Sequence, residues 1–132
     1  MILLDTHALL WLRMEDSRLG ERARHVIDLA WRADELCISA ASFWECAMLS
    51  AKRRITLPMA LPIWRRELLN QGVVEIPIDG ELAFESTRLR DFHNDPADRF
   101  IVATCLQGHR LVTADREILE WSGELDRIDA SM

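Results

Sequence analysis

The sequence predicts an α/β protein in which helices cover both faces of a central, mainly parallel sheet. Short apolar segments typical of buried strands alternate with segments of helical periodicity along the 132 residues. Such alternation favours parallel strands joined by crossover helices, and right-handed crossovers place helices on both faces of the sheet. No repeat, low-complexity tract or linker divides the chain. We therefore expect a single domain over residues 1–132.

The first half of the chain is expected to contain two strands and three helices. Ser42 and Glu45 have the spacing of a capping box, so Ser42 is the expected N-cap of a helix that runs to about residue 53. A helix over 20–31 is indicated by one apolar stripe, which consists of Ala23, Val26, Ile27 and Ala30. The other expected elements are a strand at 2–4, a helix at 6–13 and a strand at 36–40.

Proline and aspartate residues mark the elements of the second half. Pro58 or Pro62 begins a helix that ends at residue 69, and Pro77 favours an extended edge segment over 73–78. Asp95 and Pro96 mark the clearest helix start, as N-cap and first-turn residue, and that helix runs to residue 107. The remaining expected elements are a helix at 79–89, a strand at 110–114, a short helix at 116–121 and a strand at 125–128.

Composition excludes several classes of protein. A net charge of −6 argues against an ordinary basic nucleic-acid binder. The opening residues lack the basic region of a secretory signal, and no apolar run is long enough to span a bilayer, so a cytoplasmic protein without a membrane partner is expected. Cys37, Cys46 and Cys105 lie in apolar contexts without a Cys-x-x-Cys pair, as reduced core cysteines do.

Two aspartates directly follow predicted strands. Asp5 comes after Ile2–Leu4, and Asp115 comes after the apolar segment that ends at Ala114. Ligands bind at the carboxyl ends of the strands in open parallel sheets, so these two carboxylates are candidates to converge. Each also precedes a predicted helix, and at this stage a helix N-cap is an equally good interpretation.

Glu45 and Asp98 are acids at the amino-terminal ends of apolar helix faces. A buried carboxylate is costly unless it is paired or binds a metal ion. The alternative is favourable placement in the first helical turn, where the macrodipole stabilises acids. That alternative is strong for Glu45, and weaker for Asp98 because Asp95 already fills the cap position.

Four carboxylates in one cleft repel one another unless divalent cations offset their charge. Ligand sets made only of oxygen favour Mg²⁺ or Mn²⁺ over zinc. Two such ions activate water and stabilise the leaving oxygen of a phosphodiester. The spacing therefore indicates a metal site formed by acids, without specifying a reaction.

Four motifs in order resemble a known family. They are Leu4-Asp5-Thr6-His7, Ser42-Phe43-Trp44-Glu45, His93-x-Asp95-Pro96-Ala97-Asp98-Arg99 and Leu111-Val112-Thr113-Ala114-Asp115. Together they resemble the PIN-domain ribonuclease toxins of bacterial type II toxin–antitoxin systems, the VapC family. The resemblance covers nearly the whole chain. It implies a three-layer α/β/α sandwich, Mg²⁺- or Mn²⁺-dependent endonucleolytic cleavage of RNA, and a cognate antitoxin as partner.

The resemblance also implies roles for individual residues. Asp5, Glu45, Asp98 and Asp115 match the family's acidic quartet, with Asp5 and Asp98 as principal metal ligands. Thr6 and Thr113 occupy positions where the family often has a hydroxyl that orients a ligand or water.

Other residues of these motifs are expected to be structural. Arg99 contacts either a carboxylate or the scissile phosphate, and we favour an ion pair that orients Asp95 or Asp98. Asp95 is interpreted as an N-cap outside the site. His7 and His93 are expected to make structural hydrogen bonds, because a two-metal hydrolase needs no histidine base.

Basic and aromatic side chains leave two further alternatives open. The segment 52–54 with Arg65 and Arg66 forms either a groove that follows an RNA backbone or a solvated helix end. Three tryptophans, at positions 11, 44 and 64, resemble stacking platforms for single strands. Helical spacing favours core or interface packing for all three. Exposed apolar surface on the early helices suits a homodimer or an antitoxin.

Two rival functions remain. One is a non-catalytic PIN-like module that binds RNA or protein, although such a role gives no reason to keep four costly acids. The other is a phosphatase with an aspartyl nucleophile. That class has a second acid two residues after the first, where this chain has His7.

Overall fold

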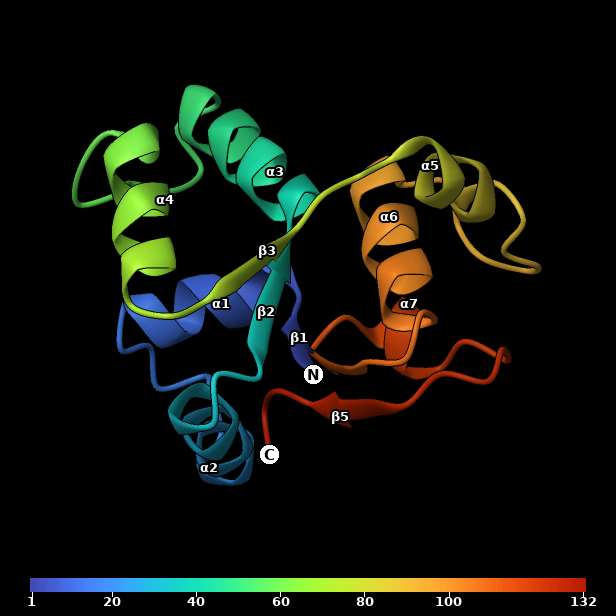
Figure 1. Cartoon of the computed structure of the whole chain (residues 1–132), viewed down its shortest axis with the longest axis horizontal. Helices are drawn as coiled ribbons and strands as arrows, with labels where there is room; N and C mark the ends of the chain where they lie inside the picture. The colour runs from blue at the N-terminus through green and yellow to red at the C-terminus, as the bar shows by residue number, and fades with distance from the viewer.

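Five strands form one sheet of order β3-β2-β1-β4-β5, and every neighbouring pair is parallel. The computed structural model describes residues 1–132 (Figure 1). The strands are β1 (Ile2–Leu4), β2 (Leu36–Ser39), β3 (Val74–Ile76), β4 (Arg110–Thr113) and β5 (Arg127–Asp129). Because all strands run in one direction, the five carboxyl ends meet at the same edge of the sheet.

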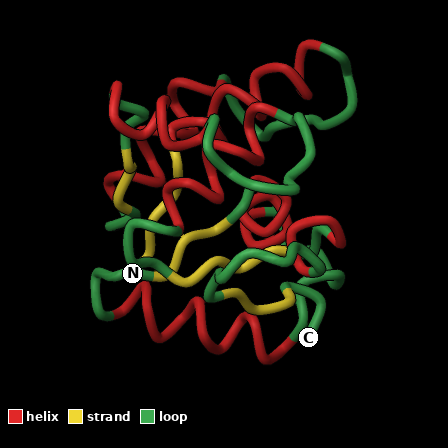
Figure 2. Tube along the Cα trace, turned by 90° about the vertical axis from the view of Figure 1, so that its right-hand side faces the viewer, coloured by secondary structure: helices red, strands yellow, loops and turns green.

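Seven helices connect the strands. They are α1 (Thr6–Arg13), α2 (Glu21–Arg32), α3 (Ala40–Ala51), α4 (Leu61–Asn70), α5 (Gly80–Ser86), α6 (Pro96–Cys105) and α7 (Arg116–Leu119). Figure 1 shows α1, α2 and α4 on one side of the sheet and α5, α6 and α7 on the other. The tube in Figure 2, turned by 90°, shows the strands in yellow among the red helices. None of the helices is both long and apolar enough to cross a membrane.

Alternating side chains of the strands enter two hydrophobic clusters, one on each face. On β1, Leu4 packs into the cluster beneath α1, α2 and α4, whereas Leu3 packs into the cluster with α6 and α7. The same alternation separates Val112 from Leu111 on β4. Strands buried on both faces read as continuous apolar runs, which is why they were predictable. The predicted α/β architecture with three layers is confirmed.

Some predicted boundaries were wrong, and α3 is the instructive case. Ser39, not Ser42, is the N-cap, and its hydroxyl accepts a hydrogen bond from the Ala41 amide at 3.0 Å. The helix therefore begins directly after β2, and Ser42 lies buried within its first turn. The capping-box interpretation of Glu45 is excluded, because Glu45 lies beyond the third helical position.

The other differences are smaller. Of the two alternatives for α4, Pro62 is correct, since the helix begins at Leu61. The edge segment at 73–78 contains β3 at Val74–Ile76, directly before Pro77. Three predicted helices are shorter at their carboxyl ends, and the last strand begins two residues later than expected; the observed elements are α5, α6, α7 and β5.

The three cysteines are free and buried, as predicted. Burial raises the pKa of the Cys37 thiol to about 11, and those of Cys46 and Cys105 to about 12. Thiols with such pKa values carry almost no thiolate near neutral pH, so none is a candidate nucleophile.

Gly20 is a position where any side chain disrupts the packing. An alanine Cβ there overlaps the backbone of Met132, whereas one at Gly80 meets nothing within 4 Å. We expect Gly20→Ala to displace the C-terminal residues, whose carbonyls accept from the Gly20 and Ala23 amides at 2.8 and 2.9 Å.

The expected cost is about 1–3 kcal/mol, or roughly 3–12 °C in Tm. Thermal unfolding followed by circular dichroism measures it, with Gly80→Ala as the matched control that leaves Tm nearly unchanged. Equal melting temperatures for the two variants contradict the prediction.

Candidate metal centre

The candidate site lies where the central strands β1 and β4 end. From β1 the chain builds β2 and β3 on one side, then returns to place β4 and β5 on the other. This reversal of strand order is the topological switch point, at which open parallel sheets form their ligand crevice. Asp5 follows β1, and Asp115 follows β4.

Asp5 is both the N-cap of α1 and a buried acid. The N-cap interpretation is therefore correct, and it does not exclude a place for Asp5 in the site. One carboxylate oxygen accepts from the Ala8 amide at 2.8 Å, which caps α1. The other accepts from the Thr113 hydroxyl. Burial raises the pKa of Asp5 to about 6, the charge of Asp115 adds to the rise, and the two hydrogen bonds oppose it.

Thr113 connects two of the acids. Its hydroxyl donates to Asp5 and accepts from the Asp115 amide at 3.1 Å. Asp115 in turn caps α7 by accepting from the Glu117 amide at 2.8 Å. Thr113 is completely buried, so its rotamer is fixed by packing and both acids are held in place.

Asp98, Glu45 and Asp95 form a second part of the site. Carboxylate oxygens of the three residues lie within 4.8 Å of one another. Asp95 caps α6 as predicted, through the Asp98 amide at 3.1 Å, yet its carboxylate also belongs to this group. The prediction that Asp95 acts only as an N-cap outside the site is therefore incomplete. The three-residue spacing between Asp95 and Asp98 could have predicted that their carboxylates lie together, because residues three apart at the start of a helix lie on the same side.

Electrostatics join the two parts into one cluster. Burial raises the pKa of Asp98 to about 7, and the negative charges of Asp95, Asp115 and Glu45 raise it further. A hydrogen bond from His93 acts in the opposite direction. No arginine or lysine forms an ion pair with Asp5, Glu45, Asp98 or Asp115.

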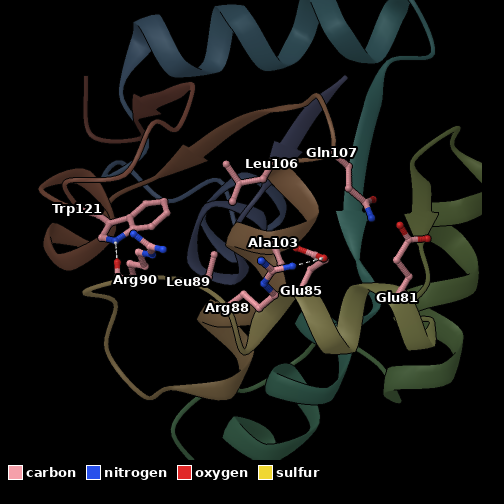
Figure 3. Close-up of a pocket in the computed structure, with 9 residues that line it drawn as sticks. All are labelled: Glu81, Glu85, Arg88, Leu89, Arg90, Ala103, Leu106, Gln107 and Trp121. Carbon is pink, nitrogen blue, oxygen red and sulfur yellow. Dashed lines mark hydrogen bonds and ion pairs between the residues drawn. The ribbon is translucent and has the colours of Figure 1, made fainter.

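This donor set fits a hard divalent cation. The donors are carboxylate oxygens, and no arginine or lysine offsets their mutual repulsion. Burial makes the ionisation of Asp5 and Asp98 costly. A hollow of about 570 Å³ lies elsewhere, between α5, α6 and Trp121. No acid of the cluster lines it, and its Arg88 pairs with Glu85 at 3.8 Å (Figure 3).

Comparison with known proteins agrees with this geometry. Residues 2–123 match the PIN domain family. The chain is 37% identical over 119 residues to Ribonuclease VapC22 of Mycobacterium tuberculosis, covering 89% of this chain and 88% of that protein. The chain belongs to the VapC family of PIN domains. A chain in a toxin–antitoxin complex from Klebsiella pneumoniae shares the fold of this PIN domain, with a TM-score of 0.64, 23% identity and 98% coverage of each chain.

His93 orients Asp98 in this PIN domain, and the predicted structural role is confirmed. Its Nε2 lies 2.7 Å from a carboxylate oxygen of Asp98, and its Nδ1 lies 3.2 Å from Glu117. The imidazole thus bridges α6 and α7 across the site. His7 differs from the expectation, because its ring is exposed and makes no hydrogen bond within the protein.

Arg99 does not make the ion pair predicted for it. Its guanidinium donates to the backbone carbonyls of Ser86, Phe92 and His93, at 3.1, 2.6 and 2.8 Å. It therefore fixes the loop before α6, including the residue that orients Asp98. Sequence proximity to Asp98 suggested a carboxylate partner, but the loop folds back over the guanidinium.

The Thr6 side chain makes no hydrogen bond to any of the acids. Its buried hydroxyl donates to the Ser42 hydroxyl at 3.1 Å, which joins the start of α1 to the helix that carries Glu45. This hydrogen bond fixes the position of α1, which Asp5 caps, relative to α3, which carries Glu45.

Proposed function

We propose that this PIN domain is a metal-dependent endoribonuclease, the toxin of a type II toxin–antitoxin module. The observation that carries the proposal is the cluster of carboxylates at the switch point of the sheet, which no arginine or lysine neutralises. The name of its relative, Ribonuclease VapC22, supports RNA as the substrate. The whole chain, residues 1–132, acts as one domain.

In this proposal Asp5, Glu45, Asp98 and Asp115 hold Mg²⁺ or Mn²⁺, with Asp5 and Asp98 as the principal ligands. A bound divalent ion lowers the pKa of water and offsets the charge that develops on the phosphodiester. Thr113 keeps the Asp5 carboxylate oriented, and Asp95 adds negative charge beside Asp98. None of the three cysteines is a suitable nucleophile, because all lie buried with raised pKa values.

The proposed partners are an RNA substrate and an antitoxin. The relative from Klebsiella pneumoniae occurs in a toxin–antitoxin complex, which supports an antitoxin for this chain as well. A homodimer is proposed from the exposed apolar side chains, and the cytoplasm is the proposed location because RNA is there.

Chelation tests the metal dependence. We expect the purified protein to cleave an end-labelled RNA in the presence of Mn²⁺ or Mg²⁺, and excess EDTA to lower the rate at least about 100-fold. The rate should return when the metal is restored above the chelator. Gel analysis of the labelled fragments measures it.

Two outcomes contradict the proposal. Full activity in excess EDTA excludes a metal mechanism. Tight RNA binding without cleavage, under every metal condition, favours the non-catalytic module instead.

A further inference from the structure

A second hollow, of about 230 Å³, adjoins the acidic cluster. Glu45 and Asp95, whose carboxylates belong to the cluster, form part of its wall. The rest of the wall includes Trp44, Met48, Lys52 and Arg54. A polymer whose backbone crosses the acids therefore reaches this hollow with its neighbouring unit.

Trp44 presents a free aromatic surface in this hollow. Sequence spacing predicted core or interface packing for three tryptophans, and Trp64 is buried as expected. Trp44 is 51% exposed, so core packing is wrong for it. No other aromatic ring and no guanidinium packs on the indole of Trp44, whereas Arg18 lies over the ring of Trp11 at 5.0 Å.

Two of the residues that line this hollow are cations without acidic partners. Lys52 and Arg54 are exposed and form no ion pair, although the chain carries a net charge of −6. Arg53, with φ of 58°, turns the chain after α3, and the Arg54 amide then donates to the Leu49 carbonyl at 2.9 Å. The turn separates the side chains, because Arg53 lines a different hollow with Ser50 and Ile55.

We propose that this hollow is a subsite for unpaired RNA, in which Trp44 stacks on the base next to the scissile phosphodiester and Lys52 and Arg54 bind a neighbouring phosphate. The inference rests on the proposed function and names its substrate class, single-stranded RNA or loops. Stacking on an aromatic ring requires a base that is free of its duplex neighbours. Unpaired cations near a backbone contribute affinity that does not depend on sequence.

The charges of the hollow favour RNA over a protein partner. An apolar helix docked on Trp44 and Met48 buries the charges of Lys52 and Glu45 without partners, which is costly. RNA supplies a base for the indole and phosphates for both cations.

Equilibrium binding tests the subsite separately from catalysis. All proteins carry Asp98→Asn, so that RNA is not cut, and the probe is a fluorescently labelled single-stranded RNA of mixed sequence. Trp44→Ala should weaken binding about 5- to 150-fold, because stacking on an aromatic side chain contributes about 1–3 kcal/mol per base. Trp44→Phe should recover most of the affinity.

Salt dependence tests the cations with a matched control. Lys52→Ala and Arg54→Ala should each reduce the slope of log affinity against log salt by about 0.7. Arg53→Ala removes the same charge one residue away and should leave that slope unchanged. A blunt RNA duplex of the same sequence should show no loss of affinity with Trp44→Ala.

Three results would overturn the subsite. The first is an unchanged affinity of Trp44→Ala for the single strand. The second is an equal loss of affinity of Trp44→Ala for the single strand and for the duplex. The third is a loss of self-association in Trp44→Ala with unchanged RNA affinity, which would assign the hollow to a protein interface. Failure of the proposed function appears differently, as an Asp98-containing protein that binds RNA but never cleaves it.

Discussion

Asp98→Asn is expected to lower RNA cleavage at least about 1,000-fold while the protein stays folded. The substitution removes the charge of an acid whose oxygens lie within 4.8 Å of those of Glu45 and Asp95. An amide is a poor ligand for a hard divalent cation, and removal of a group essential to catalysis costs several kcal/mol of transition-state stabilisation. Asp5→Asn should have a similar effect, because Asp5 follows the central strand of the sheet.

The measurement is single-turnover cleavage of a labelled RNA, with circular dichroism as the check on folding. Asp28→Asn is the matched control, since Asp28 is exposed on α2 and makes no side-chain hydrogen bond or ion pair. It should cleave RNA at the rate of the unsubstituted protein. If Asp98→Asn retains that rate as well, the assignment of the site is wrong.

The convergence of the acids was predictable because it depends on strand direction. Asp5 and Asp115 follow apolar runs, and parallel strands end at a common edge, so local sequence was sufficient to bring them together. Glu45 and Asp98 could be singled out because each is a carboxylate on an apolar helix face, Glu45 within α3 and Asp98 in the first turn of α6. Their nearness to one another depends on how α3 packs against α6, which the sequence analysis could not derive.

The errors arose where a residue's partner is distant or where two local signals compete. Ser39 and Ser42 are both good caps, and the end of β2 decided between them. Arg99 was expected to pair with a neighbour in sequence, whereas its three acceptors are the carbonyls of Ser86, at the end of α5, and of Phe92 and His93 in the loop before α6. Trp44 has helical spacing with apolar neighbours, but whether a helix face is covered is a tertiary property.

The stability of the metal-free protein should fall as pH rises from about 4 to about 8. Asp5 and Asp98 have pKa values of about 6 and about 7 in the folded protein, against an ordinary value of 3.8. Both carboxyls therefore bind protons more tightly in the folded state than in the unfolded chain. The stability that results is fully present below about pH 4 and is lost as pH rises through 6 and 7.

Other groups with shifted pKa values affect stability in a different pH range or oppose the trend only weakly. Hydrogen bonds lower the pKa values of Asp16, Glu75 and Asp129, so their contributions change in acid, below the range considered. Burial lowers the pKa of His109, which opposes the trend near its ordinary value. Comparison with Asp98→Asn removes these shared contributions, since both proteins contain them.

Asp98→Asn should therefore be more stable than the unsubstituted protein at about pH 8 without metal, and equal to it near pH 4. The rise from 3.8 to about 7 is about three pKa units, and at about 1.4 kcal/mol per unit it sets an upper bound of about 4 kcal/mol. Because Asp98 is only partly buried, solvent screening reduces the expected gain to about 1–2 kcal/mol, or roughly 4–8 °C in Tm. Differential scanning fluorimetry in EDTA measures it. A variant that loses activity and gains stability shows that the acid is kept at a cost to the fold.

Added Mn²⁺ should make the unsubstituted protein more stable than Asp98→Asn at pH 8. A ligand that binds only the folded state stabilises it by about 2.7 kcal/mol at one hundred times its dissociation constant, so the Tm of the unsubstituted protein should rise with metal concentration. Asp98→Asn should show little rise. Equal shifts in both proteins place the bound metal away from Asp98. If Mn²⁺ raises the Tm of the unsubstituted protein alone, the cation binds through Asp98 and relieves the repulsion among these acids. This conclusion does not depend on any measurement of RNA cleavage.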